Sequence, residues 1–412
     1  PFQTFLGYQA GNVTTGANNT WVGYQAGLLN TSGFDNTAVG FQALDAMTTG
    51  QESVAIGTNA LGANATGTGN IAVGAAALFK ATGSLNVSVG SYSSYNTTTG
   101  GQNVAVGHQV LFANTTGGSN TAVGYAALDA NTTASNNTAI GIDALGTNTT
   151  GPQNVAVGNY SLALNTTGSK NVSIGYASLD SNTTGADNTA VGYLAANAIT
   201  SASYITAIGS NALYSATADY NTAVGYGSGF NITTGANNTL LGFQAAANGT
   251  NDLTTGSNNI VIGYNASVSS PSVSNENTFG RSSTTSNRFW GDFKMGGSSA
   301  GTSGQVLTSA GAGVAPTWAA VSASAATPTT EGTVYAKTTT GSLTALGNGA
   351  AASAGTNSEN VAIGVNTYSS GTGSQNTIVG HASGNGGGFS NCTAVGAYAL
   401  SGFSSNSGNN NN

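Results

Sequence analysis

Asn120-Thr121-Ala122-Val123-Gly124-Tyr125-Ala126-Ala127-Leu128 is the stretch that predicts the fold, because it returns in variant form along most of the chain. Its glycine recurs at sixteen positions, and of the fifteen steps between them eleven are 17 residues, three are 16 and the last is 21. A period held in this way is the signature of a stacked repeat architecture. The marker glycines are Gly7, Gly23, Gly40, Gly57, Gly74, Gly90, Gly107, Gly124, Gly141, Gly158, Gly175, Gly192, Gly209, Gly225, Gly242 and Gly263.

Each coil carries a β-strand pattern before its glycine. Val, Ile or Leu precedes the glycine, and Thr, Val or Ile stands two positions earlier, as at Val39 and Thr37. This spacing puts the two side chains on one face of a short strand, with a small residue such as Ala38 on the other face. The glycine is expected to take a bend that a Cβ would obstruct. An aromatic-to-Leu stretch and an Asn-Thr-Thr-Gly turn complete the coil.

These features predict an all-β fold, a parallel β-solenoid or β-roll of 17-residue coils, each with two short strands in two layers. Stacked at about 4.8 Å per coil, fifteen steps would make a rod of roughly 70 Å.

Asparagine recurs four residues before the marker glycine, and we expect these side chains to stack as a ladder along the rod. The predicted structural ladder comprises Asn120, Gly124, Asn137, Gly141, Asn154, Gly158, Asn171, Gly175, Asn188 and Gly192. Asparagines of the closing turns, such as Asn114, Asn131 and Asn148, also lie in N-x-S/T sequons. A role in the turns is favoured over glycosylation, which would require a glycosylating secretory route.

The repeat pattern divides the chain into four parts. Residues 1–268 are predicted to form an array of about 16 coils, and 269–358 a non-repetitive connector or knob. The period returns in 359–403 as a second short solenoid array, and 404–412 form a polar tail that we expect to be disordered. The chain opens in mid-coil, so an upstream segment is expected.

Composition argues against several classes of function. Only 6 Lys and Arg occur in 412 residues, too few to neutralise a phosphate track, so nucleic-acid binding is not expected. The sequence contains no run of about 18 apolar residues, so insertion into a membrane is not predicted. Cys392 is the only cysteine, which excludes an intrachain disulfide. Charged residues make up only 5% of the chain, and the bulk of it is Gly, Asn, Thr, Ser and Ala.

No catalytic, cofactor-binding or metal-binding residue is predicted, and the protein is not expected to be an enzyme. His108 and His381 each follow a marker glycine, where other coils carry Tyr or Phe. Acidic residues occupy turn positions five after the glycine or five before it, where Asp bonds its own backbone. Asp45, Asp129 and Asp180 lie five residues after a marker glycine. The residues five before a marker glycine are Asp35, Glu52, Asp187 and Glu359. Cation binding and polysaccharide cleavage at such acids remain weaker alternatives.

So thin a coil buries little apolar surface by itself, and this favours a homo-oligomer in which other copies cover a second face. A parallel homotrimer about a threefold axis would also protect the flanks of the solenoid.

Two stretches resemble known families. The Asn-Thr-Ala-Val-Gly-Tyr coil resembles the head repeat of trimeric autotransporter adhesins, which implies a left-handed parallel β-roll in a trimer. Gly301 to Ser309 followed by Gly313 to Trp318 is similar to a linker motif of bacteriophage tail fibres, as is Glu331 to Tyr335.

The second resemblance implies a virion tail appendage that attaches to a host, with other virion tail proteins and a host surface glycan or protein receptor as partners. The alternatives are a bacterial cell-surface trimeric adhesin and a subunit of a self-assembling extracellular filament. The receptor-binding residues are not identifiable from the pattern. We expect the aromatic side chains of Trp21, Tyr24 and Tyr193 to be exposed, which makes them candidates for glycan contact, although the repeat itself accounts for Tyr24 and Tyr193.

Overall fold

The fold was analysed in a computed structural model of the 412-residue chain. The structure describes residues 2–249, 251–281, 305–308, 317–320, 344–346, 359–367, 374–384 and 390–399. The chain divides into two compact units, Pro1–Arg288 and Phe289–Asn412, and each is described by itself.

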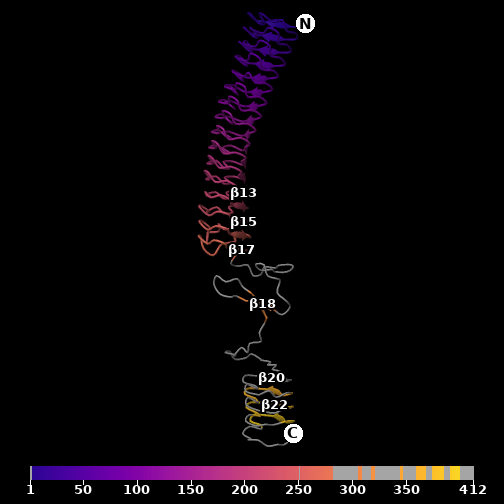
Figure 1. The fold of residues 1–412 in the computed structure, drawn as a ribbon, viewed down its shortest axis with the longest axis vertical. Coiled ribbons are helices and arrows are strands. Elements are labelled where there is room, and N and C mark those ends of the chain that lie inside the picture. The colour runs from indigo at the N-terminus through magenta and orange to yellow at the C-terminus, as the bar shows by residue number, and fades with distance from the viewer. Residues whose placement is uncertain are drawn as a thin grey trace. The chain divides into compact units, whose positions relative to one another are not determined.

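The first unit is a stack of coils joined by one parallel sheet of seventeen three-residue strands (Figure 1). Each strand pairs in parallel with its sequence neighbours, so that Val155 lies opposite Val172 and Val157 opposite Ile174. The prediction of an all-β parallel solenoid is therefore confirmed, and the described residues contain no helix. The strands are β1 (Thr4–Leu6), β2 (Thr20–Val22), β3 (Thr37–Val39), β4 (Val54–Ile56), β5 (Ile71–Val73), β6 (Val87–Val89), β7 (Val104–Val106), β8 (Thr121–Val123), β9 (Thr138–Ile140), β10 (Val155–Val157), β11 (Val172–Ile174), β12 (Thr189–Val191), β13 (Thr206–Ile208), β14 (Thr222–Val224), β15 (Thr239–Leu241), β16 (Ile260–Ile262) and β17 (Asn277–Phe279).

The second strand expected in each coil is absent from this sheet, and a run of turns takes its place. In the coil of β3, Gln42 and Leu44 have φ of 52° and 54°, in the left-handed region that a strand does not use. The Gln42 N–H donates to Tyr24 O of the preceding coil, and the Leu44 N–H donates to Ala60 O of the following one. The amides of these two left-handed residues thus point to opposite neighbouring coils, and the segment stays hydrogen-bonded between coils without a β-ladder.

The core runs along the inside of the stack and is built from small residues. The middle residue of most strands is a fully buried Ala, such as Ala38, and a buried Leu such as Leu44 faces it from the turn segment. The apolar core forms two clusters, one from Trp21 to Ala81 and the other from Ala105 to Val268. Between them lies the coil of β6, where Ser88 and Ser93 are buried and bonded to each other at 2.6 Å.

The first array continues past the boundary expected at residue 268. Strand β17 pairs with β16 and is followed by Gly280, 17 residues after Gly263. The repeat pattern did not identify this coil, because Glu276 occupies the position where other coils carry the ladder Asn. The Glu276 N–H still donates to Asn259 Oδ1 at 2.8 Å, as an Asn at this position would.

The second unit contains two small sheets within its described residues. Strands β18 (Gln305–Thr308) and β19 (Thr317–Ala320) form an antiparallel pair in the region predicted as connector. Strands β20 (Thr344–Leu346), β21 (Val361–Ile363), β22 (Thr377–Val379) and β23 (Thr393–Val395) form a parallel sheet, so this array begins before the expected residue 359. Cys392 is buried at the ladder position, and its N–H donates to Asn376 Oδ1 at 3.0 Å. The polar tail 404–412 lies outside the described residues.

Candidate functional site

The predicted asparagines line up inside the stack as a hydrogen-bonded ladder. Asn120, Asn137, Asn154, Asn171 and Asn188 are all buried. The Oδ1 of each accepts the backbone N–H of the next ladder residue at 2.9–3.0 Å. In four of the five, Nδ2 also donates to a carbonyl of the following coil's turn at 2.8–3.0 Å. The ladder therefore links side chain to backbone in every one of these coils, and Asn120 Nδ2 also donates to the side-chain amide of Asn103 at 3.1 Å, as a ladder of stacked amides predicts.

The marker glycines form a second column at the bend after each strand. Gly124, Gly141, Gly158, Gly175 and Gly192 have φ of 133–142°, which L side chains rarely adopt. A Cβ on any of them would lie 2.3–2.6 Å from backbone atoms of the glycine one coil further on. Glycine is required here both for its conformation and for the close approach of successive coils.

A second asparagine ladder follows the closing turns and includes the sequons. Asn114, Asn131, Asn148, Asn165 and Asn182 are fully buried. Between neighbouring members Nδ2 donates to Oδ1 at 2.8–3.3 Å, and each Nδ2 also reaches the carbonyl three residues on. A glycan on these nitrogens would have to enter the core, so the burial favours the structural role of these residues.

The outward face of the sheet carries exposed apolar side chains along its length. In β9 the middle residue Ala139 is buried, whereas Ile140 is 41% exposed, and Ile174 of β11 and Leu241 of β15 are 40% and 46% exposed. The strand pattern predicted which residues share a face, but did not show which face of the coil a single chain leaves uncovered.

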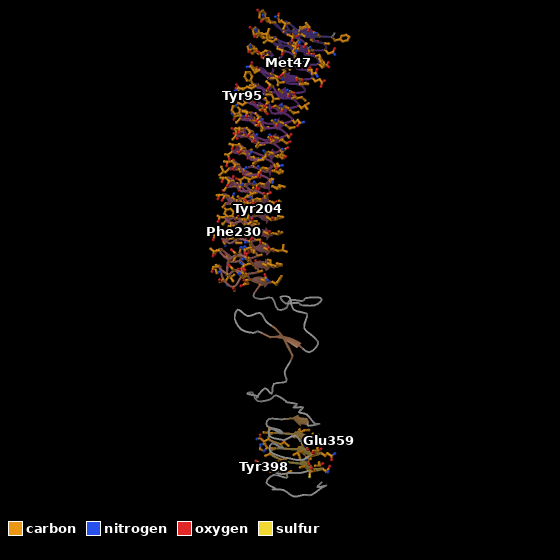
Figure 2. All side chains as sticks on the ribbon, in the orientation of Figure 1. Met47, Tyr95, Tyr204, Phe230, Glu359 and Tyr398 are labelled. Atoms are coloured by element: carbon orange, nitrogen blue, oxygen red, sulfur yellow. The ribbon has the colours of Figure 1, made fainter. Side chains whose placement is uncertain are left out.

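Aromatic side chains stack at the position after the marker glycine. Tyr226, Phe243 and Tyr264 form one such column, with ring centroids 5.2–5.3 Å apart. His108 occupies the same position and stacks on Tyr125 at 5.7 Å. Side chains project from every coil of the first unit (Figure 2). His381 of the second unit also takes this place, next to Tyr398 at 5.6 Å.

The expectation that Trp21 is exposed is wrong, whereas Tyr24 and Tyr193 are 43% and 53% exposed. Trp21 is fully buried at the strand position where other coils carry Ala. Space for the indole comes from Gly11 and Gly27, which replace the buried Leu of other coils and whose Cβ atoms would lie within 2.5 Å of its ring. These glycines are the sequence signal that could have placed Trp21 in the core.

The acids are dispersed along the turns. Burial raises the pKa of the Asp45, Asp129 and Asp180 carboxyls, and in Asp129 the neighbouring Asp143 raises it further. Within the described ranges no three His, Cys, Asp or Glu side chains gather in a way that could hold a metal ion. Nor does any helix of these ranges have the length and apolar character to cross a membrane.

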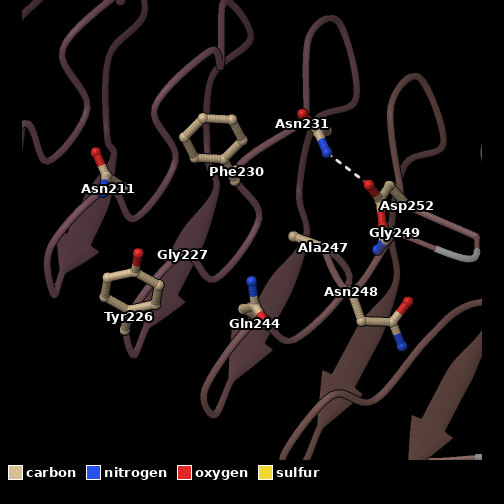
Figure 3. A pocket seen from close by; sticks show the side chains of 10 residues that line it. All are labelled: Asn211, Tyr226, Gly227, Phe230, Asn231, Gln244, Ala247, Asn248, Gly249 and Asp252. Atoms are coloured by element: carbon tan, nitrogen blue, oxygen red, sulfur yellow. Dashed lines mark hydrogen bonds between the residues drawn. The ribbon is translucent and has the colours of Figure 1, made fainter.

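A cavity of about 380 Å³ lies where the repeat is interrupted by the 21-residue step between Gly242 and Gly263 (Figure 3). Its lining includes two aromatic rings, those of Tyr226 and Phe230, and the polar side chains of Asn231, Gln244 and Asp252. The interruption was visible in the glycine spacing, but the spacing could not show that a hollow forms beside it.

The fold and these columns define the chain as a parallel β-solenoid repeat protein. Comparison with protein-family models and with curated proteins finds no match.

Proposed function

We propose that this chain is a structural fibre protein of a virion, a phage tail fibre that mediates host attachment, and that its rod is a parallel homotrimer. The observation that carries the proposal is the outward face of the seventeen-stranded sheet. Side chains such as Ile140, Ile174, Ile208 and Leu241 leave 40–46% of their surface exposed in a single chain. An apolar strip repeated along an entire rod is typical of an interaction surface.

A further copy of the same chain fits this strip better than an unrelated partner does. The exposed columns repeat once per coil, at the strand spacing of about 4.8 Å. Only a partner with the same period can keep its apolar side chains in register along all the coils, and an identical copy in parallel has that period. Closure about a threefold axis gives each chain two equivalent neighbours and leaves no copy with an open strip.

The assignment to a virion rests on the sequence of the second unit. The segments that resemble tail-fibre linkers contain β18 and the first half of β19, two strands that pair with each other, and a further parallel sheet follows them in the sequence. Rigid coil arrays on either side of a connector suit a protein that must reach a host surface. Several weak contacts by the copies would then add up to firm attachment.

A bacterial surface adhesin is the second candidate, favoured by the resemblance of the coil to adhesin head repeats. It would use the same trimeric rod. An extracellular filament is the third, in which the coils of successive molecules would stack end to end along the rod.

The oligomer is tested by measuring the mass of the full chain with light scattering after size-exclusion chromatography. We expect three times the 40.1 kDa of a single chain. The double variant Ile140→Lys/Ile174→Lys should disperse the trimer because it places six charges at the contact. The control Thr133→Lys/Thr167→Lys changes exposed turn residues in the same region and should leave the mass unchanged. A monomeric wild type would overturn the trimer.

The virion assignment is tested by immunogold electron microscopy with antibody raised against residues 1–268. Gold on fibres that project from phage particles would support it. Gold on cell envelopes would favour the adhesin, and gold along free filaments without particles would favour the filament.

A further inference from the structure

We infer that the cavity at the interrupted coil is a binding subsite for a neutral pyranose sugar. The inference deepens the proposed attachment function, on which its biological role rests, by naming the class of receptor. Tyr226, Phe230, Asn231, Gln244, Ala247 and Asp252 contribute to its wall, and they come from two successive coils and the inserted segment (Figure 3). A volume of about 380 Å³ is within the range of small-ligand sites.

Phe230 provides an aromatic platform with one free face. One side of its ring stacks on Tyr214 with centroids 5.1 Å apart and planes 12° from parallel. The next residue of this column is Ala247, which is buried and presents only a methyl group. The aromatic stack therefore ends at the cavity. The electron-rich face of such a ring attracts the weakly positive C–H bonds on the flat side of a pyranose.

Asp252 is held in place and still has hydrogen-bonding capacity. Its Oδ2 accepts from Asn231 Nδ2, and its Oδ1 accepts from the Gly249 N–H at 2.6 Å. A carboxylate has about four acceptor positions, so sites remain for sugar hydroxyls. These two bonds orient the carboxylate before any ligand arrives, and this lowers the entropic cost of binding.

The side-chain amide of Gln244 adds a donor and an acceptor on the same wall. It makes no hydrogen bond to another described residue, although the side chain is only partly exposed. A sugar hydroxyl both donates and accepts, so a lining that contains an amide and a carboxylate suits it better than it suits an apolar or purely acceptor ligand.

The charge of the cavity selects neutral sugars over acidic ones. Asp252 is the only carboxylate in the lining, and no Lys or Arg lies there to pair with an anionic ligand. An acidic sugar would bring a second negative charge close to Asp252. The polar side chains of the lining also disfavour a lipid chain, which would leave them unpaired.

The inference is tested by saturation-transfer-difference NMR on the full chain with glucose, galactose, N-acetylglucosamine and rhamnose, and with glucuronic acid as the acidic comparator. We expect transfer to at least one neutral sugar and less to glucuronic acid. Phe230→Ala and Asp252→Ala should each weaken binding about tenfold.

Phe112→Ala is the matched control. Phe112 occupies the same place in its coil as Phe230 and ends a stack on Tyr95 at 5.6 Å, but it lies outside the cavity. This variant should bind like the wild type, and its circular dichroism reports what the loss of one stacked ring does to folding. Absence of transfer to all four neutral sugars, or equal binding by Phe230→Ala and wild type, would overturn the sugar subsite. The fibre proposal would not fall with the sugar subsite, because the oligomer mass from light scattering and the immunogold labelling test it separately.

Discussion

Replacing one marker glycine by alanine tests whether the close approach of successive coils limits the stability of the rod. We choose Gly141→Ala, in the coil that follows β9. Gly141 has φ of 137°, and a Cβ there would lie 2.5 Å from Gly158 O, 2.6 Å from its carbonyl carbon and 2.9 Å from Asn159 N. All three atoms belong to the backbone of the next coil, so no side-chain rotation can relieve the contact.

The expected cost is the sum of two effects. Forcing alanine into this backbone conformation costs about 1–3 kcal/mol. Overpacking against the neighbouring backbone costs about 1–3 kcal/mol more. The free energy of unfolding should therefore fall by about 2–6 kcal/mol. Gly146→Ala, in the same coil, is the control. Gly146 lies outside the left-handed region and its nearest contact would be Asp143 O at 3.3 Å, so we expect a change within about 1 kcal/mol.

Both variants should be unfolded in urea and followed by far-UV circular dichroism at one fixed protein concentration, because an oligomer's stability depends on concentration. Hydrogen exchange then locates the damage. In a solenoid each coil contacts only its neighbours, so protection should fall first between β9 and β10, where the Gly158 N–H donates to Ile140 O at 2.8 Å. Equal midpoints for Gly141→Ala and Gly146→Ala would refute the reasoning.

Three further predictions follow from the ladders and the last coil. Asn154→Ala should cost about 1–3 kcal/mol because it leaves the Asn171 N–H buried and unpaired, whereas the Gly168 carbonyl keeps its hydrogen bond from Asn165 Nδ2. Equilibrium unfolding that shows no loss of stability would contradict the ladder's role. Partial burial of Glu276 opposes its ionisation, but hydrogen bonds from Ser269 and Thr278 outweigh this and lower its pKa. The contribution of ionised Glu276 to the stability of the folded state is therefore complete above the pKa of the unfolded chain, about 4.3. It is lost as the pH falls through the lower pKa of the folded state. In the wild type, the hydrogen-exchange protection of the β17 coil should fall in acid. If the Glu276→Gln variant shows the same fall, protonation of Glu276 is not its cause. Finally, folded protein secreted from a glycosylating host should carry no glycan on Asn148, as peptide mass spectrometry can show, because that side chain is fully buried.

The parallel register and the ladder positions could be predicted because both follow directly from the period. Once Gly158 and Gly175 lie 17 residues apart and stack, Val155 must lie opposite Val172, and Asn154 must precede Asn171 in the same column. The residue types then fit their places. Asn supplies an acceptor and a donor to the backbone, and Gly supplies the bend.

The second half of the coil could not be predicted in the same way. Leu44 has a β-compatible side chain, and its spacing within Phe41 to Leu44 suggested a strand. Its φ of 54° is imposed by hydrogen bonds to neighbouring coils, which a local pattern does not reveal. For the same reason the sequence pattern wrongly predicts an exposed Trp21. The space that admits it exists only because Gly11 and Gly27 carry no side chain where a Cβ would lie within 2.5 Å of its ring.

The site of the one long step shows which part of the coil can accept change. Between Gly242 and Gly263 the extra residues enter the turn segment, while Thr239 of β15 still lies opposite Ile260 of β16. The ladder also passes through undisturbed, because the Asn259 N–H donates to Asn238 Oδ1 at 3.0 Å across the insertion. The sheet and the ladder need every coil to match its neighbours, whereas the turn edge needs only to return the chain to the next strand. The turn edge is therefore where a repetitive rod can acquire a site of its own, and the cavity beside Phe230 and Asp252 lies there.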